Sequence, residues 1–570
     1  MKTRNKLYDK SRLRLLCLLT ALLGLFGAGQ TWAGNPTTLT VGDTEVLNGG
    51  YWTTNGSGKL TATDSTTDYN VKYDSATGTL TLKDATITGV ASTYFGAGIY
   101  VEGDLTIMLI GSSSITGVQP SLNANSGGLI VGNGNLTVIG DGSLTVNAAD
   151  GKDSNRSYAI QVDYDMTQQG GSITCNGGKG SFSYGMYLNG KLIVHQGSIT
   201  ACGGTATETS YGIYIDAIDT SVSVSDATVT ATSGIGSNGS YGIYIQALST
   251  SSVTVFGGGS LTAQSGSATS EAGGIYFMNP IGSAGTVTVG DNSTLLANSV
   301  ILCDNSFTEK PLAPTGNGSW LIYGQSNQTS AVGGSYTLTD NLTIESGNTL
   351  TIPAGSTLTI PEDKTLTADA DQLVVNGELV LEGTFTADAK ELTGTGAIVL
   401  GEITLTDDKG MDEYKDYQLK LKSKKVTYVR ALSDNSQYGT ICLPFVPTSV
   451  AGGQVTYYQV EKLGNNVITL VETDFEAGKP LFYQTPGTGS ITFSAESAAG
   501  VELVTTPATD NFMVGTMSEV IPTAGYFLKN GNIYPIANGE KVKVKPFRAY
   551  VKGQNDASQA SVMSVNVARP

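Results

Sequence analysis

One short phrase recurs between residues 98 and 277 and constrains the fold more than any other feature of the chain. It reads GIYV, GLIV, AIQV, GMYL, GIYI, GIYI and GIYF at 98–101, 128–131, 159–162, 185–188, 212–215, 242–245 and 274–277. The copies follow one another at about 30 residues, a period typical of repeat architectures in which each unit buries its apolar face against the next. Two further short apolar runs separate successive copies, for example KLIV and GSIT after GMYL. The phrase therefore predicts a parallel β-helix with three strands per coil.

Strand alternation assigns each position of the phrase to a face. In the copy at 212–215, Ile213 and Ile215 share one face and Tyr214 takes the other. The aliphatic positions are expected to stack inside the coils. The predicted outer column reads Tyr100, Ile130, Gln161, Tyr187, Tyr214, Tyr244 and Tyr276. Two residues further along each strand, the same face reads Glu102, Gly132, Asp163, Asn189, Asp216, Gln246 and Met278.

This outer column is the candidate binding site. Exposed tyrosines at steps of about 5 Å, next to amides and carboxylates, form a flat amphipathic strip. Aromatic ring faces suit the C–H faces of sugars, and carboxylates and amides suit their hydroxyls. The predicted carbohydrate-binding residues are Tyr100, Tyr187, Tyr214, Tyr244, Tyr276, Asp163, Asn189 and Asp216. The alternative is a purely structural aromatic ladder, because tyrosine also favours strands.

The ionisable groups of the repeat favour binding over catalysis. Asp163 and Asp216 share the outer column, but two coils separate them, which places them about 10 Å apart, at the loose end for an acid–base pair. His195, the one histidine, falls on the outer face of a second strand, away from the tyrosines. We therefore predict a non-catalytic polysaccharide-binding or adhesin-like protein without catalytic residues. The alternatives are a β-helix polysaccharide lyase or glycoside hydrolase, and a structural stalk presenting the C-terminal domain.

Charge and the N-terminus restrict partners and location. A net charge of −17 argues against nucleic acid as a partner, because its phosphates bind to basic protein surfaces. Acidic groups make Ca²⁺ the one candidate ion. Residues 1–33 have the basic start, apolar core and small-residue end of a signal peptide, with cleavage expected before Gly34. No later run is apolar enough for a transmembrane helix. The expected product is an exported monomer, extracellular or on the outer cell surface.

Four cysteines follow the predicted leader, and two of them fall in consecutive coils. Cys175 and Cys202 both come after GSIT, but they are offset by one position, because Cys202 aligns with Asn176. A bridge is within reach across adjacent coils, and two free thiols are the favoured interpretation.

Composition changes along the chain predict further domains. Repeats near eight residues at 336–405, such as NTLTIPAG and STLTIPED, predict a narrower solenoid with one strand per short repeat, and aromatics and prolines rise after residue 430. The predicted divisions are a signal peptide at 1–33, an N-terminal cap at 34–69, the parallel β-helix at 70–305 with its first coil at 70–89, a second β-solenoid or spacer at 306–408, a charged linker at 409–430 and a C-terminal antiparallel β-sandwich at 431–570.

Two stretches resemble known families. YDSATGTLTLKDATITG at 73–89, followed by the phrases at 98–117 and 128–148, resembles a secreted bacterial carbohydrate-binding family with a right-handed parallel β-helix similar to that of pectate lyases. That resemblance covers residues 40–300 and implies binding of acidic or cellulosic polysaccharide and of Ca²⁺, without placing the calcium ligands. YGTICLPF at 438–445, AGKPLFYQ at 477–484 and KPFRAYV at 545–551 are similar to a β-sandwich module of surface and secreted proteins of Gram-negative gut anaerobes.

Overall fold

The computed structural model describes most of the chain from residue 36 onward. The residues that it leaves undescribed are 1–35, 92–95, 121–124, 152–154, 270, 280–284, 304–308, 325–329, 433–437, 465, 486–488, 530–531, 537–540, 554–561 and 569–570. The predicted signal peptide and its cleavage site therefore lie outside the described residues. The described residues form two compact units, the first within 1–254, 263–285 and 303–308, and the second within 255–262, 286–302 and 309–570. They are all-β, and among them only η1 (Ala370–Gln372) and η2 (Ala389–Glu391) are short 3-10 helical turns.

The first unit is built from three long sheets. Sheet 1 carries the phrase and contains β8 (Ile99–Glu102), β11 (Ser126–Gly132), β14 (Arg156–Val162), β17 (Gly180–Leu188), β20 (Ala206–Ala217), β23 (Gly239–Ala247) and β26 (Glu271–Met278). Sheet 2 contains β6 (Thr79–Lys83), β9 (Leu105–Ile110), β12 (Leu136–Gly140), β15 (Met166–Gln168), β18 (Leu192–Val194) and β21 (Thr220–Ser225). Sheet 3 contains β7 (Thr86–Thr88), β10 (Ser112–Thr116), β13 (Ser143–Asn147), β16 (Ser172–Asn176), β19 (Gly197–Cys202) and β22 (Ala227–Thr232).

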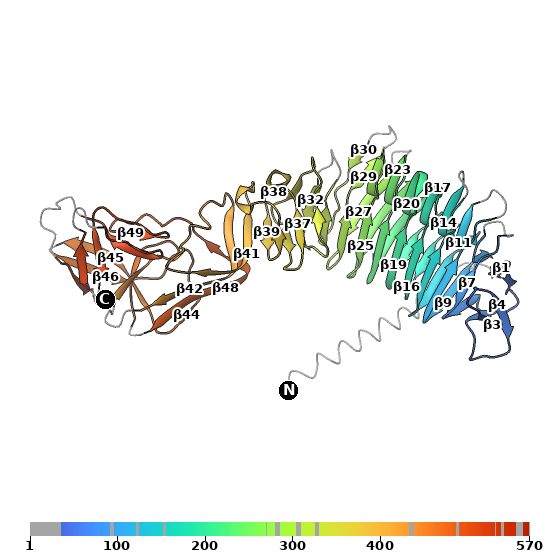
Figure 1. The fold of residues 1–570 in the computed structure, drawn as a ribbon, viewed down its shortest axis with the longest axis horizontal. Coiled ribbons are helices and arrows are strands. Elements are labelled where there is room, and N and C mark those ends of the chain that lie inside the picture. Colours follow the sequence, from blue (N-terminus) through green and yellow to red (C-terminus); the bar gives the residue numbers. More distant parts are fainter. Residues whose placement is uncertain are drawn as a thin grey trace. The chain divides into compact units, whose positions relative to one another are not determined.

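The chain visits these three sheets in turn, and neighbouring strands within each sheet are parallel. In sheet 1, Ile213 pairs with Met186 on one side and with Ile243 on the other. Figure 1 shows the result as ranks of parallel arrows running from blue to green. Long parallel sheets visited in rotation are consistent with the predicted β-helix, because parallel neighbours need a crossover and not a hairpin.

The aliphatic positions of the phrase form the core, as the alternation predicts. Ile213, Ile215, Ile243 and Ile245 are all fully buried. Like residues stack on like because the period keeps each coil in register with the next, so the apolar face of every strand is covered by its neighbours.

The N-terminal strands pair antiparallel with this array. β1 (Thr38–Val41) runs antiparallel to β8, and β2 (Thr44–Glu45) to β1. β3 (Gly50–Thr54) lies between β4 (Leu60–Thr63) and β5 (Val71–Asp74) in sheet 2, antiparallel to both.

The predicted first coil at 70–89 begins differently from the later ones. β5 and β6 form an antiparallel hairpin within one sheet, and only β6 and β7 continue into the parallel arrays. The turn between them is tight, with Gly78 at a φ of +63°. So short a connection joins antiparallel strands only, which explains the difference.

The register of sheet 3 settles the relation of the two cysteines within the described residues. Cys175 pairs with Ala201, and Asn176 pairs with Cys202, as the alignment predicts. One residue of offset places the side chains on opposite faces of the sheet. Cys175 is therefore fully buried and Cys202 half-buried, and both thiols are free.

The two units alternate along the chain between residues 255 and 308. The strands from here to the end of the alternation are β24 (Ser251–Phe256), β25 (Ser260–Gln264), β27 (Gly285–Val289), β28 (Thr294–Ala297), β29 (Val300–Cys303) and β30 (Glu309–Pro311). The second unit continues with β31 (Ser319–Ile322), which pairs parallel with β28 and antiparallel with β32 (Ser330–Gly333).

The short repeats after residue 330 also form parallel ladders. Consecutive strands belong to different sheets: β33 (Ser335–Thr337), β36 (Thr357–Ile360), β39 (Glu378–Leu381) and β41 (Ala397–Leu405) share one, β34 (Leu342–Thr343), β37 (Thr365–Thr367) and β40 (Thr384–Phe385) a second, and β32, β35 (Leu350–Ile352) and β38 (Leu373–Val375) a third. Each short repeat supplies one strand, as predicted, and three successive repeats visit the three sheets. Their inward leucines and isoleucines form a continuous core.

The run assigned to a charged linker contains a core strand. β42 (Lys420–Ala431) pairs parallel with β41 and antiparallel with β48 (Ser490–Leu503). Its apolar residues Val426 and Tyr428 are fully buried, whereas its lysines lie on the other face. There Lys422 bridges Glu378 at 2.6 Å and Lys425 bridges Glu402 at 2.7 Å. The dense charge therefore marks one face of an alternating strand.

Two smaller sheets complete the second unit. One has the order β43 (Tyr438–Ile441), β47 (Leu481–Gln484), β45 (Thr456–Gly464), β46 (Val467–Glu472) and β53 (Ser564–Val567). The other has the order β49 (Met513–Thr516), β52 (Arg548–Val551), β50 (Tyr526–Lys529) and β51 (Asn532–Pro535). Outside these two sheets, β44 (Ser449–Ala451) pairs with β48. Most pairs are antiparallel, and β46 with β53 is parallel. No helix in the described part of the chain has the length and apolar character to cross a membrane.

Candidate functional site

The tyrosines of the phrase form part of a double stack on sheet 1. Besides the predicted outer column, a second column lies three residues earlier in each strand, at Tyr158, Tyr184, Tyr211 and Tyr241. Alternation alone would put residues three apart on opposite faces of a strand. In β20, however, Tyr211 and Tyr214 meet edge to face with their ring centroids 4.9 Å apart.

A break in the alternation beside the glycine of the phrase brings the two columns together. In β20 the residues from Thr209 to Ile213 are buried in succession, whereas a regular strand would alternate. A Cβ on Gly212 would come within 2.6 Å of the Gly242 carbonyl oxygen and 2.7 Å of the Thr232 amide. At Gly212 a side chain would therefore crowd the neighbouring backbone, whereas the copy at 159–162 accommodates the small Ala159 at the same position.

The outer column stacks face to face along the direction of the coils. Tyr187 and Tyr214 lie 5.2 Å apart at 8° between ring planes, and Tyr214 and Tyr244 lie 5.3 Å apart at 4°. Tyr244 and Tyr276 continue the stack at 5.2 Å and 6°. Each ring face therefore covers the face of its neighbour. This differs from a row of outward ring faces.

The inner column is more deeply buried. Tyr184 and Tyr211 stack 5.0 Å apart at 8°, and their exposed fractions are 3% and 8%. Burial raises the pKa of Tyr184, with a further contribution from the neighbouring Tyr211. Burial likewise raises the pKa of Tyr211 to about 12. Burial therefore favours the neutral form of both phenols, and their rings belong to the core.

The hydroxyls of the double stack meet polar groups of the adjacent coils. Tyr241 donates to Glu271 over 2.5 Å, and Tyr214 donates to Oε1 of Gln246 over 3.2 Å. Arg156 bonds the Tyr158 hydroxyl at one end of the inner column. The stack therefore carries its own hydrogen-bonding partners along one edge.

The predicted tyrosines do not form one uninterrupted column. Tyr187, Tyr214 and Tyr244 are contiguous and half-buried, and Tyr276 ends the stack at 3% exposed. Tyr100 lies on the same face in β8 but pairs with Ile130, and its hydroxyl bonds Glu102. Ile130 and Gln161 thus separate Tyr100 from the main stack.

The predicted polar residues lie beside the outer column. Asp163 accepts from the Asn133 amide at 3.0 Å and from the Gln161 side chain at 3.2 Å. Asp216 pairs in register with Gln246, and burial raises the pKa of its carboxyl against the opposing influence of Arg156. Asn189, the third predicted partner, is half-buried and follows Leu188 at the end of β17.

The remaining chemistry-bearing residues of the first unit are isolated. His195 is exposed and its Nδ1 lies 3.2 Å from the Ser225 hydroxyl, away from the stack. Within the described ranges, no three side chains among His, Cys, Asp and Glu are grouped closely enough to hold a metal ion.

The inner column is the feature that the sequence reasoning missed. Its signal is the triplet Ser-Tyr-Gly ahead of Ile-Tyr or Met-Tyr, which recurs at 183–187, 210–214 and 240–244. The buried serines of this triplet cap the adjoining turns; Ser210, for example, donates to the Gly204 carbonyl at 2.7 Å. The second tyrosine directly precedes the four-residue phrase, so it lies outside the repeat as the phrase defines it.

No family model, no curated protein and no solved structure matches the chain.

Proposed function

We propose that this chain is an exported, non-catalytic polysaccharide-binding or adhesin-like protein. In this proposal the first unit is a right-handed parallel β-helix with three strands per coil. A narrower solenoid follows it, and the C-terminal sheets pack as a sandwich. The ligand lies along the outer column of sheet 1.

The half-buried edge of the tyrosine stack carries the proposal. In β17, β20 and β23 it presents one tyrosine hydroxyl per coil, flanked by Asn189, Asp216 and Gln246 in turn, at a step of about 5 Å. A regular row of donors and acceptors suits a linear polymer with repeated hydroxyls. Contact is therefore through ring edges, hydroxyls, Asp163, Asn189 and Asp216, since the ring faces cover one another.

A structural role for the stack is the second candidate, and the covered ring faces favour it. Edge-to-face and stacked pairs each contribute about 0.5–1.5 kcal/mol beyond area burial. Both columns are filled in the three coils of β17, β20 and β23, so the double stack stiffens the first unit whether or not it binds ligand. In that case the protein is a stalk that presents the C-terminal part.

Tyr214→Phe separates the two candidates, because it removes the hydroxyl and leaves the stacked ring. The first measurement is a glycan array on the secreted chain, followed by calorimetric titration of any glycan bound. Loss of one hydrogen bond is expected to weaken binding about 3- to 10-fold. Tyr211→Phe, which makes the same change in the buried column of the same coil, is the matched control and should bind as the wild type does.

Each result decides between the candidates. Equal binding by Tyr214→Phe and the wild type removes the outer column from the site. Absence of binding to any glycan supports the stalk. Release of new reducing ends from a bound glycan would show an enzyme and would overturn the non-catalytic proposal.

A further inference from the structure

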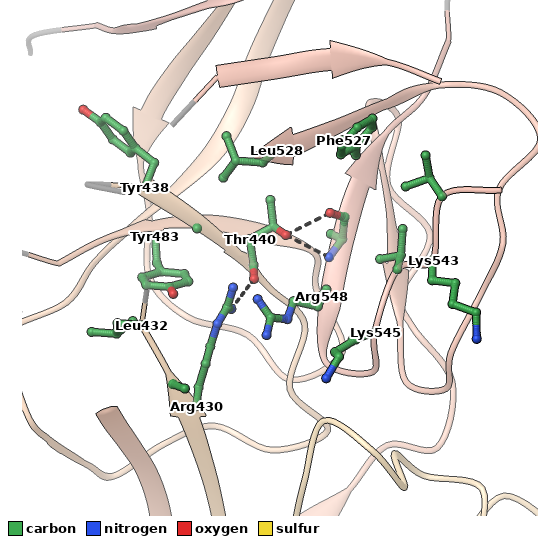
Figure 2. Close-up of a pocket in the computed structure, with 15 residues that line it drawn as sticks. Arg430, Leu432, Tyr438, Thr440, Tyr483, Phe527, Leu528, Lys543, Lys545 and Arg548 are labelled. Carbon is green, nitrogen blue, oxygen red and sulfur yellow. Dashed lines mark hydrogen bonds between the residues drawn. The ribbon is translucent and has the colours of Figure 1, made fainter. Parts of the chain in front are cut away.

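A cavity of about 430 Å³ lies in the second unit, at the ends of several strands. It is lined by the end of β42, by β43, β47, β50 and β52, and by the segment 542–545. Four of its lining residues are cationic: Arg430, Lys543, Lys545 and Arg548. No aspartate or glutamate is among the described residues that line it. Figure 2 shows the two guanidinium groups side by side, with Thr440 on one side and Lys545 beyond.

Arg430 is the most deeply buried of these cations. Its exposed fraction is 5%. The guanidinium donates to the Thr440 carbonyl over 2.5 Å and lies over the Tyr483 ring, 4.9 Å from its centroid. No carboxylate among the described residues lies within ion-pair distance of it. Burial, and then the neighbouring Arg548, lower the pKa of Arg430.

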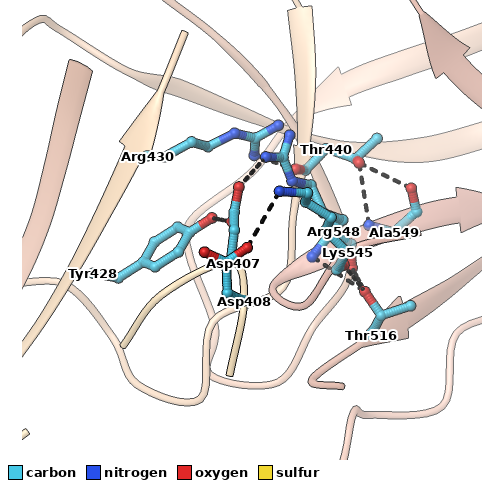
Figure 3. Close-up of polar contacts among 9 residues, drawn as sticks. All are labelled: Asp407, Asp408, Tyr428, Arg430, Thr440, Thr516, Lys545, Arg548 and Ala549. Carbon is cyan, nitrogen blue, oxygen red and sulfur yellow. Dashed lines mark hydrogen bonds and ion pairs between the residues drawn. The ribbon is translucent and has the colours of Figure 1, made fainter. Parts of the chain in front are cut away.

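Arg548 pairs with a carboxylate, Asp407, that also faces Arg430. Its Nη2 donates to Asp407 over 2.5 Å, whereas its buried Nε has no hydrogen-bond partner among the described residues. Burial alone would raise the pKa of Asp407, but the Tyr428 hydroxyl and Arg548 hold that pKa below its usual range. Figure 3 shows Asp407 between Tyr428 and the guanidinium groups. One carboxylate therefore faces two guanidinium groups.

The charges at the mouth of the cavity are already paired. Lys543 bridges Glu519 at 2.7 Å and Lys545 lies 3.5 Å from Asp408. These pairs are mostly exposed and contribute little. The excess positive charge therefore lies in the interior, where Arg430 and Arg548 face the single carboxylate of Asp407 among the described residues. A buried cation without a counter-charge is costly.

We propose that this cavity binds the carboxylate of a small organic acid. Guanidinium groups favour planar, bidentate contacts with carboxylates, and both Arg430 and Arg548 line the cavity. Tyr438, Phe527 and Leu528 on the cavity wall suit an apolar or sugar-like body attached to that group. Such a ligand would neutralise the excess charge left by Asp407. The site lies in the second unit and is independent of the proposed binding of polysaccharide along sheet 1.

The test is a calorimetric titration of the full chain at fixed ionic strength. The probes are sodium acetate, sodium benzoate and sodium galacturonate, with sodium chloride and sodium sulfate as the reference anions. Saturable binding of at least one carboxylate, at concentrations where chloride and sulfate give none, is the expected result. Galacturonate binding more tightly than benzoate would assign a sugar acid, and the reverse would assign an apolar acid. Equal responses to all anions would overturn the proposal.

Variants assign the binding to this cavity. Arg430→Met replaces the buried cation by an apolar chain of similar length; it removes the hydrogen bond to the Thr440 carbonyl, so the melting temperature is measured alongside binding. It should weaken carboxylate binding by about 10-fold or more. Lys545→Gln should weaken it by about 2- to 3-fold, as expected of an exposed charge. Lys541→Gln, an exposed neighbour outside the lining, is the control. Undiminished binding by Arg430→Met, with an unchanged melting temperature, would place the ligand elsewhere.

Discussion

The tyrosine face of the first unit and the arginine cavity of the second are both polar and partly buried, but they are satisfied in different ways. Each ring in the face is covered by the ring of the next coil, and its hydroxyls find partners on neighbouring strands. The cavity gathers two guanidinium groups around one carboxylate. Repetition supplies each tyrosine of the stack with an identical neighbour, whereas the irregular strands of the second unit leave one charge unbalanced among the described residues. We therefore expect the tyrosine face to lose stability when a ring is removed and to change little when a charge is removed. We expect the cavity to lose stability when a charge is removed and to depend less on the packing of rings.

The largest effect is expected from Tyr211→Ala. Tyr211 stacks with Tyr184 and Tyr241 and meets Tyr214 and Tyr244 edge to face. Truncation of a buried aromatic leaves a void that a register-locked solenoid cannot close, at a cost of about 3–5 kcal/mol. Urea unfolding followed by tyrosine fluorescence measures it, with Tyr211→Phe as control at less than about 1 kcal/mol. A small loss for the alanine variant would show that the stack contributes little to stability.

A smaller effect is expected from Asp407→Asn. The change removes the carboxylate that faces Arg430 and Arg548, and it leaves both cations in place. Removing one partner of a fully buried pair costs about 3–5 kcal/mol, and the partial exposure of Asp407 reduces this to about 2 kcal/mol.

The neighbouring residue provides a matched control. Asp408→Asn changes a side chain that is 86% exposed and lies 3.5 Å from Lys545, so its effect should be near zero. Denaturant unfolding of both variants gives the comparison. Added carboxylate should partly restore Asp407→Asn, because the ligand replaces the lost charge; equal stability of the two variants would remove Asp407 from the charge balance of the cavity.

The smallest effect concerns alkaline pH and the first unit. The pKa of Tyr211 is raised from 10.0 to about 12 in the folded chain, so the folded state holds this proton more tightly than the unfolded state. The contribution is complete below pH 10 and is lost as the pH rises towards 12. For Tyr211 the loss reaches about 1 kcal/mol by pH 11. Denaturant midpoints of the wild type and of Tyr211→Phe between pH 9 and pH 11 test this, because the variant lacks the Tyr211 contribution; an equal fall in both proteins would contradict it.

Much of the first unit follows from the sequence alone. The phrase repeats at a fixed period and alternates with period two, so its aliphatic positions had to share one face and stack from coil to coil, as Ile213 and Ile243 do. The same logic gave the one-residue offset between Cys175 and Cys202, which the pairing of Asn176 with Cys202 confirms. Local pattern suffices here because each contact repeats the contact one coil before.

The tertiary structure decided what repetition does not encode. The orientation of the tyrosine rings is set by contacts between coils: Tyr211 and Tyr214 meet edge to face, and Tyr187 and Tyr214 stack face to face. The charged run before Arg430 became a strand because β41 and β48 pair with it. Arg430 and Arg548, far apart in sequence, meet only through the packing of irregular strands. The periodic pattern therefore fixed which residues are inside, whereas long-range packing fixed which polar groups are left without a counter-charge.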